Sequence, residues 1–244
     1  QMTGAHCITI AGGKVGCGKT TRAVNTAYAL DDAGYNVVVV DTDLAMPNLH
    51  TVLGTSHEPT IHDVLADAEP LEAAIDTSGD VAAVYGDPSL DRYTDADPAG
   101  LKTVCNRLRT AFDVVVLDTG AGVTHATMVP CGLADDVVLV TTAKEHGVAD
   151  TTRTKEMAEH VDSHIPGVVV TRTDAETGRE TAERLETTLL SAVPDEPDVF
   201  AVDPDGLVVG PTGLRECRAD LASDRVVVRD VDLPALDRQN ERIA

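Results

Sequence analysis

Gly13-Lys-Val-Gly-Cys-Gly-Lys-Thr20 is the stretch of sequence that decides the fold. It matches the pattern Gly-x4-Gly-Lys-Thr in full, with a β-rich run before it and a helical pattern from Lys19. Glycines let the backbone curl until its N–H groups point inward at phosphate oxygens, and a helix N-terminus adds its positive dipole end. The sequence therefore predicts a phosphate-binding loop between a strand and a helix.

The side chains of this loop have distinct expected roles. Lys19 is placed to reach the β- and γ-phosphates of a nucleotide, and the Thr20 hydroxyl is placed to ligate Mg²⁺. ATP or ADP with Mg²⁺ is therefore the predicted ligand. The predicted nucleotide-binding residues here are Gly13, Lys14, Val15, Gly16, Cys17, Gly18, Lys19, Thr20 and Thr21.

Short β-rich runs alternate with helical stretches along the 244 residues. This alternation predicts an α/β fold of the P-loop NTPase class, with a mainly parallel central sheet covered by helices on both faces. We expect a single domain with a divergent C-terminal segment from about residue 195. Strands are expected at residues 7–11, 37–40, 81–85, 114–117, 137–140, 168–170 and 226–228. Helices are expected at 19–33, 101–111, 148–164 and 178–190, with one or two short helices in 60–74 broken at Pro70 and a loop at 87–100.

Two of the apolar runs end in aspartate. Asp41 and Asp43 follow residues 37–40, and Asp118 follows residues 114–117. A carboxylate at a strand end beside a phosphate loop suits a place near Mg²⁺ or its waters. The predicted metal site is therefore Thr20, Asp41 and Asp118.

Lys14 is a second lysine near the start of the loop, and it narrows the class of phosphate-loop protein that the chain resembles. With it the chain resembles the deviant Walker A family of MinD and ParA ATPases, whose loop usually reads Lys-Gly-Gly-x-Gly-Lys-Thr. In that family the early lysine reaches across a dimer interface to the partner's nucleotide, so the resemblance implies this role for Lys14. Val15 stands where the family has Gly, and a β-branched residue tolerates positive φ poorly. If the family's backbone is strained there, Val15 must relax it, which weakens the expected contact of Lys14.

Further segments carry the same resemblance. Residues 41–54 resemble the family's switch I, which implies that Asp43 orients the attacking water and that Asp41 lies near the metal through water. Residues 112–122 resemble its Walker B strand and switch II, with Thr119 and Gly120 in place of commoner residues. The resemblance thus implies a catalytic set of Lys14, Lys19 and Asp43.

Thr171 and Arg172 stand where the family usually has Asn-Arg beside the adenine, so the resemblance makes both nucleotide-binding residues. A threonine hydroxyl cannot offer the hydrogen-bonding edge of an amide. We therefore expect weaker base selectivity than the family pattern implies. The resemblance covers roughly residues 5–195.

Charge and cysteine content limit the function classes. Acidic residues number 41 against 19 basic ones, a formal net charge of −22, which we interpret as adaptation to a salt-rich cytoplasm, typical of a halophilic archaeon. Nonspecific nucleic-acid binding is disfavoured because phosphates need a basic patch. The five cysteines contain no Cys-x-x-Cys pair, which argues against a disulfide scaffold or a self-contained zinc site. No apolar run of transmembrane length occurs, so a cytoplasmic protein is expected.

The resemblance implies a MinD-like ATPase that forms a homodimer on binding ATP and hydrolyses it, with the help of an activating protein, to position a cellular cargo or the division machinery. One alternative is a nucleotide-gated scaffold with negligible hydrolysis. Others within the superfamily are an iron–sulfur carrier, for which Cys131 is a candidate ligand, and a partitioning ATPase. Peripheral membrane binding stays open, because residues 233–244 are short and not basic enough for a clear amphipathic anchor.

Overall fold

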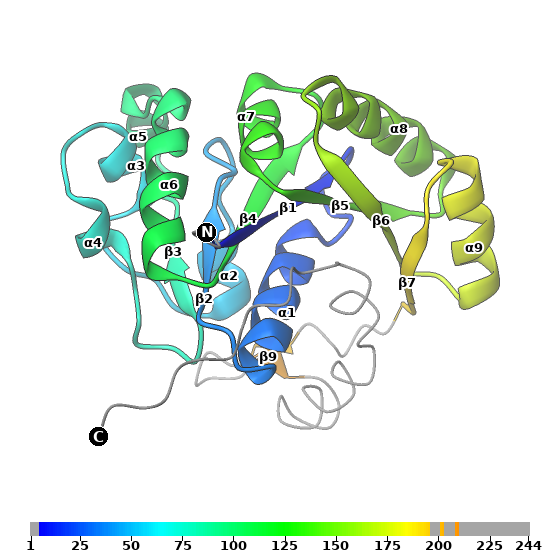
Figure 1. Ribbon diagram of the computed structural model, residues 1–244, viewed down its shortest axis with the longest axis horizontal. Helices are drawn as coiled ribbons and strands as arrows, with labels where there is room; N and C mark the ends of the chain where they lie inside the picture. Colours follow the sequence, from blue (N-terminus) through cyan, green and yellow to red (C-terminus); the bar gives the residue numbers. More distant parts are fainter. Residues whose placement is uncertain (1–4, 196–200, 203–207, 210–244) are drawn as a thin grey trace, which may run out of the picture.

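The protein is described here by a computed structural model that covers residues 5–195, 201–202 and 208–209. Its centre is a seven-stranded, all-parallel sheet in the order β3-β2-β4-β1-β5-β6-β7 (Figure 1). The strands are β1 (His6–Gly12), β2 (Val37–Asp41), β3 (Ala82–Val84), β4 (Val114–Ala121), β5 (Asp136–Thr142), β6 (His164–Thr171) and β7 (Leu189–Val193). A separate two-residue pairing joins β8 (Ala201–Val202) to β9 (Val208–Val209).

Helices lie on both faces of this sheet, as the sequence predicts. They are α1 (Lys19–Asp32), α2 (Leu49–Leu53), α3 (Ile61–Leu65), α4 (Leu71–Ala74), α5 (Leu90–Asp95), the 3₁₀ turn η1 (Pro98–Gly100), α6 (Leu101–Ala111), α7 (His125–Leu133), α8 (Glu145–His160) and α9 (Ala175–Arg184). One face of the sheet packs on α1 and α2, and the other packs on helices from α3 to α9. The predicted fold class is therefore confirmed.

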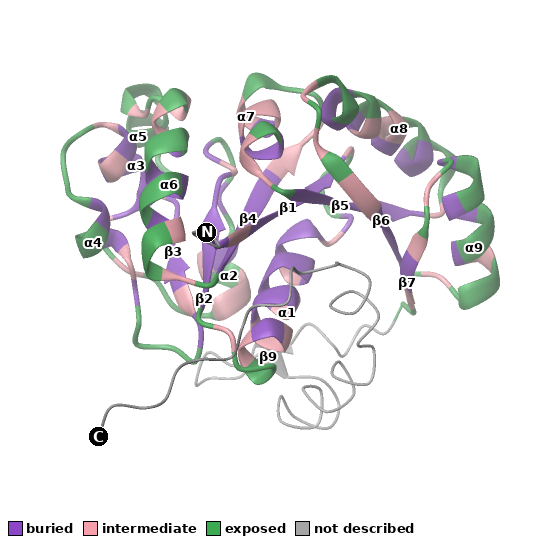
Figure 2. Ribbon diagram, in the orientation of Figure 1, coloured by how far each residue is buried: buried purple, intermediate pink, exposed green. Residues whose placement is uncertain are grey.

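Alternation along each strand explains why both faces are covered. In β2, Val37 and Val39 pack towards α1, whereas Val38 and Val40 pack towards α3, α4 and α6. Successive side chains of a strand point to opposite faces, so an all-apolar run needs a hydrophobic layer on each side. Figure 2 shows the central strands as buried along most of their length.

Three sequence-based boundaries are wrong. The expected loop at 87–100 contains α5 and η1. The expected helix at 178–190 is α9, which begins at Ala175 after the N-cap Asp174 and ends at Arg184, so β7 follows where a helix was expected. The expected helix at 148–164 begins three residues earlier and ends at His160, and His164 opens β6. The expected strand at 226–228 lies outside the described residues, and the single-domain organisation stays a prediction.

The amino-terminal end of the sheet holds a group of partly buried charged side chains. Asp136 at the start of β5 accepts one hydrogen bond from His6 Nε2 at 2.6 Å and another from His164 Nδ1 at 2.5 Å. Burial raises the pKa of Asp136, but these two imidazoles outweigh burial and hold it below its usual range. Arg109 donates to the carbonyls of Ala5 and Leu133 and tethers α6 to the strand starts. Asp136 and Arg109 at this end of the sheet therefore both have hydrogen-bond partners.

Candidate functional site

The phosphate loop connects β1 to α1 at the opposite, carboxyl end of the sheet. Its left-handed residues are Gly16, with φ of 76°, and Gly18, with φ of 95°. Val15 is not among the non-glycine residues of positive φ in the described chain, and its side chain is 67% exposed. The two glycines therefore make the curl, and the backbone at Val15 is not left-handed.

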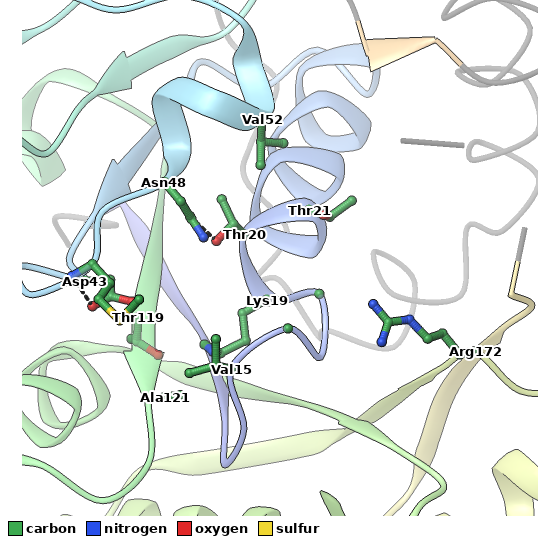
Figure 3. A pocket seen from close by; sticks show the side chains of 13 residues that line it. Val15, Lys19, Thr20, Thr21, Asp43, Asn48, Val52, Thr119, Ala121 and Arg172 are labelled. Atoms are coloured by element: carbon green, nitrogen blue, oxygen red, sulfur yellow. Dashed lines mark hydrogen bonds between the residues drawn. The ribbon is translucent and has the colours of Figure 1, made fainter. Parts of the chain in front are cut away.

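A cavity of about 250 Å³ opens beside this loop (Figure 3). It brings together residues from the loop, the start of α1, switch I, switch II and the end of β6. Its lining residues are Val15, Gly16, Gly18, Lys19, Thr20, Thr21, Asp43, Met46, Asn48, Val52, Thr119, Ala121 and Arg172. Eight of the predicted site residues line the cavity: Val15, Gly16, Gly18, Lys19, Thr20, Thr21, Asp43 and Arg172.

The other predicted residues of the loop are not among those that line the cavity. Cys17 is buried, and Lys14 is exposed on the loop. Gly13 lies against α8 so closely that a Cβ there would be 2.1 Å from the carbonyl carbon of Asp150. Lys19 is buried, and its Nζ donates to the Lys14 carbonyl at 3.4 Å, so the loop wraps its own lysine.

Asp118 lies in the buried part of β4 and has a carboxylate with no hydrogen-bond partner among the described residues. Its side chain is fully buried, and burial together with the nearby charge of Asp41 raises its pKa well above the ordinary value. The Thr20 side chain and the Lys19 charge act in the opposite direction. Buried polar groups normally have partners, so two orphaned oxygens beside a Thr hydroxyl and a Lys ammonium fit an oxygen-ligated cation such as Mg²⁺.

Asp41 is paired with Asp118 across neighbouring strands, but its surroundings differ. One oxygen accepts the N–H groups of Asn48 and Leu49, both at 3.0 Å, and the other accepts that of Asp43 at 3.1 Å. Burial nevertheless raises the pKa of Asp41 to about 7. Asp41 therefore holds the backbone of switch I through these three hydrogen bonds. Its predicted place in the metal site stays a prediction.

The two predicted switches touch each other at Asp43. The Asp43 carboxylate accepts the Met46 N–H at 3.1 Å and lies over Gly120. A Cβ at Gly120 would come within 2.9 Å of Asp43 Oδ1, so the glycine that departs from the family pattern leaves room for this carboxylate. Buried His62 supports the same segment, because its Nε2 bonds the Leu44 carbonyl at 2.9 Å.

Thr171 and Arg172 are neighbours in sequence but have different surroundings. The Thr171 hydroxyl bonds the carbonyls of Cys17 at 2.8 Å and Thr141 at 3.1 Å, and Thr171 does not line the cavity. Arg172 does line it, with a left-handed backbone at φ of 57°. Thr171 is therefore a tether of the phosphate loop, and the predicted place of both residues beside the nucleotide base stays a prediction.

Sequence reasoning missed Asn48 and Met46, which also line the cavity. Asn48 Oδ1 accepts the Thr20 hydroxyl at 2.6 Å, a contact between residues 28 positions apart (Figure 3). The only sequence signal for it was its place in the Asn-Leu segment after Asp43.

The iron–sulfur alternative loses its candidate ligand. Cys131 is fully buried in the core between α7, α8 and the sheet, and burial raises its pKa to about 12. A buried thiol of this kind behaves as a small apolar side chain. Among the described helices, none has the length and apolar character needed to cross a bilayer.

Comparison with known proteins adds the family. Residues 8–207 match the model of the CobQ/CobB/MinD/ParA nucleotide-binding domain. The chain is 30% identical over 201 residues to an uncharacterized ATP-binding protein of Methanocaldococcus jannaschii, covering 80% of this chain and 76% of that protein. It is 27% identical over 253 residues to the septum site-determining protein MinD of Bacillus subtilis, covering 97% and 94%. Its structure is similar to that of MinD complexed with Mg-ADP from Pyrococcus horikoshii OT3, with a TM-score of 0.82, 26% identity, and coverage of 97% and 100%.

These relatives do not support a halophilic source, which rests on the charge balance alone. The family match spans most of the 244 residues and includes every residue predicted for the site. The chain therefore belongs to the CobQ/CobB/MinD/ParA family of nucleotide-binding domains, with MinD among its relatives.

Proposed function

We propose that this chain is a MinD-like ATPase that dimerises on binding Mg·ATP and hydrolyses it slowly to drive the positioning of a cellular cargo. The observation that carries the proposal is that Lys19, Thr20 and Asp43 line one cavity next to a phosphate loop, with the unpartnered carboxylate of Asp118 buried close to Lys19 and Thr20. The similarity to septum site-determining MinD supports the positioning role.

The residues of the site have separate tasks in this reaction. Lys19 leaves the Lys14 carbonyl to meet the β- and γ-phosphates, while the N–H groups of the loop hold the phosphate oxygens. Thr20 and Asp118 would hold Mg²⁺, which would supply neutralisation of charge on the phosphate oxygens. Asp43, held against Gly120, orients the attacking water towards the γ-phosphate.

Exposed apolar side chains around the cavity support the dimer. Val15, Met46 and Val123 are 67%, 64% and 50% exposed, and the first two line the cavity. Large apolar side chains grouped at a surface favour a protein partner. Lys14 is exposed on the same loop, where a second subunit would meet it.

Phosphate release tests the ATPase assignment, at low salt and at molar KCl. Asp43→Ala should lower turnover about 100-fold while nucleotide binding is retained, because the water loses its orienting carboxylate. Glu180→Ala, which removes an exposed carboxylate on α9, is the matched control and should turn over like the wild type. Equal rates in wild type and Asp43→Ala would reject hydrolysis at this site and leave a nucleotide-gated scaffold.

Mass measurement tests the dimer. Asp43→Ala with Mg·ATP should run as a dimer at micromolar protein, and Asp43→Ala/Lys14→Ala should run as a monomer. A monomer in the single variant argues against the proposed role of Lys14.

Nucleotide affinity tests the base site. ATP and GTP should bind with similar affinity if Thr171 gives the base no contact.

A further inference from the structure

The hydroxyl of Thr20 has one proton and two candidate acceptors. In the structure Thr20 Oγ1 donates it to Asn48 Oδ1 at 2.6 Å (Figure 3). The Asp118 carboxylate lies close enough for the same hydroxyl to lower its pKa, but by hydrogen-bond geometry neither of its oxygens has a partner among the described residues. The single proton of the Thr20 hydroxyl is directed at Asn48, so Asp118 receives no hydrogen bond from it.

The backbone of Asn48 cannot easily follow its side chain. Its N–H donates to Asp41 Oδ2 at 3.0 Å, and the N–H of Leu49 donates to the same oxygen. Asp41 is fully buried, so this anchor is shielded from water. Release of Thr20 therefore requires only a turn of the Asn48 side chain, which is exposed towards the cavity.

We propose that Asn48 is a placeholder that holds Thr20 in the metal-free protein and competes with assembly of the Thr20–Asp118 metal site. Thr20 and Asp118 would hold the metal together, and a carboxylate is a stronger acceptor than an amide oxygen, so Asp118 would then take the hydrogen bond from Thr20. The bond to Asn48 is lost at that step. Asn48 thus acts as a positioning residue that weakens Mg²⁺ binding in the free protein and ties the side chain of switch I to the state of the metal site. This inference rests on the proposed function, because it concerns the metal of the same nucleotide site.

Titration of Mg²⁺ into protein mixed with a fluorescent ADP analogue measures the effect without any turnover. Asn48→Ala should lower the Mg²⁺ concentration at half-saturation about fivefold, which is the factor for one net hydrogen bond. Asn48→Leu, which keeps the side-chain size but not the acceptor, should show the same shift. Asn36→Ala removes an asparagine that donates to the Ala111 carbonyl at 3.0 Å outside the site, and should leave the titration unchanged.

A second variant pair isolates the bond itself. In a Thr20→Ala background, Asn48→Ala should no longer shift the Mg²⁺ titration, because the donor is gone. A higher Mg²⁺ requirement in Asn48→Ala would overturn the proposal, since Asn48 would then be a ligand of the metal or its water. An unchanged requirement would overturn it equally. Wild-type protein that does not bind the ADP analogue with Mg²⁺ would instead contradict the proposed function.

Discussion

The two ends of the parallel sheet hold buried aspartates in different surroundings. At the amino end, Asp136 accepts hydrogen bonds from two histidines and its pKa is lowered. At the carboxyl end, Asp118 has no partner among the described residues and its pKa is raised. The residue type is the same, but Asp118 is the more deeply buried of the two, so depth of burial and hydrogen-bond partners both contribute to the difference.

This contrast separates a structural carboxylate from a functional one. A partnered buried carboxylate stabilises the fold, whereas an orphaned one costs stability until a ligand meets it. Removing the charge should therefore have opposite effects on stability at the two ends of the sheet. The following variants test that contrast, from the largest expected effect to the smallest.

Asp118→Asn should have the largest effect. Phosphate release should fall about 100-fold or more, because a charged group of the reaction site is lost. The metal-free protein at pH 8 should become more stable by about 1 to 3 kcal/mol, since a buried charge without a partner is removed. Denaturant unfolding in EDTA measures the second effect. A loss of stability in this variant would contradict the proposed difference between the two buried aspartates.

Gly120→Ala tests the contact between the switches. The new Cβ would lie within 2.9 Å of Asp43 Oδ1, so the carboxylate must move. We expect turnover to fall about 10-fold to 100-fold with nucleotide affinity nearly unchanged, because only the orientation of water is affected. Gly34→Ala is a poor control because Gly34 is left-handed, whereas Gly79→Ala has room, with its nearest contact at 3.6 Å, and should turn over normally.

Asp136→Asn probes the amino end. Loss of the charge-assisted bonds from His6 and His164 should destabilise the protein by about 1 to 3 kcal/mol. Nucleotide affinity and turnover per folded molecule should stay at the wild-type level, because this end is remote from the cavity. Denaturant unfolding and phosphate release on one preparation measure both quantities. A large loss of turnover would mean that the two ends are coupled.

The pH dependence of these two stability effects should also differ in sign. The folded-state pKa of Asp136 is lowered, so its contribution is present above the unfolded value near 3.8 and is lost as pH falls through the folded pKa. The loss caused by Asp136→Asn should thus shrink as pH falls below that unfolded value. The pKa of Asp118 is raised, so its cost grows as pH rises, and the gain from Asp118→Asn should be larger at pH 8 than at pH 5.

The sequence predicted most of the sheet and the phosphate end of the site. Apolar runs such as residues 37–40 need burial on both faces, and the spacing from Gly13 to Thr20 requires a strand, a loop and a helix. Local composition failed at α5, where Asp and Pro suggested a loop, and at β7, whose short edge strand has no pattern distinct from a helix end.

The missed parts of the site depend on contacts between distant segments. Asn48 meets Thr20 only because α2 folds back against α1, and Gly120 matters only because Asp43 lies over it. The tether made by Thr171 was missed for the same reason, since its hydroxyl bonds a loop 154 residues earlier in the chain, while its predicted place beside the base stays a prediction. Sequence patterns report what a residue can do, and tertiary contacts decide which partner it meets.

The bond from Thr171 to the Cys17 carbonyl has an evolutionary consequence. It anchors the phosphate loop from a neighbouring strand, so the shape of the loop does not depend on the residues at positions 15 and 17 alone. A loop held from outside can exchange a family glycine for Val15 without losing its curl. We expect homologues that carry Thr at position 171 to vary more at these two loop positions than homologues that carry Asn, and a comparison of such sequences can test this.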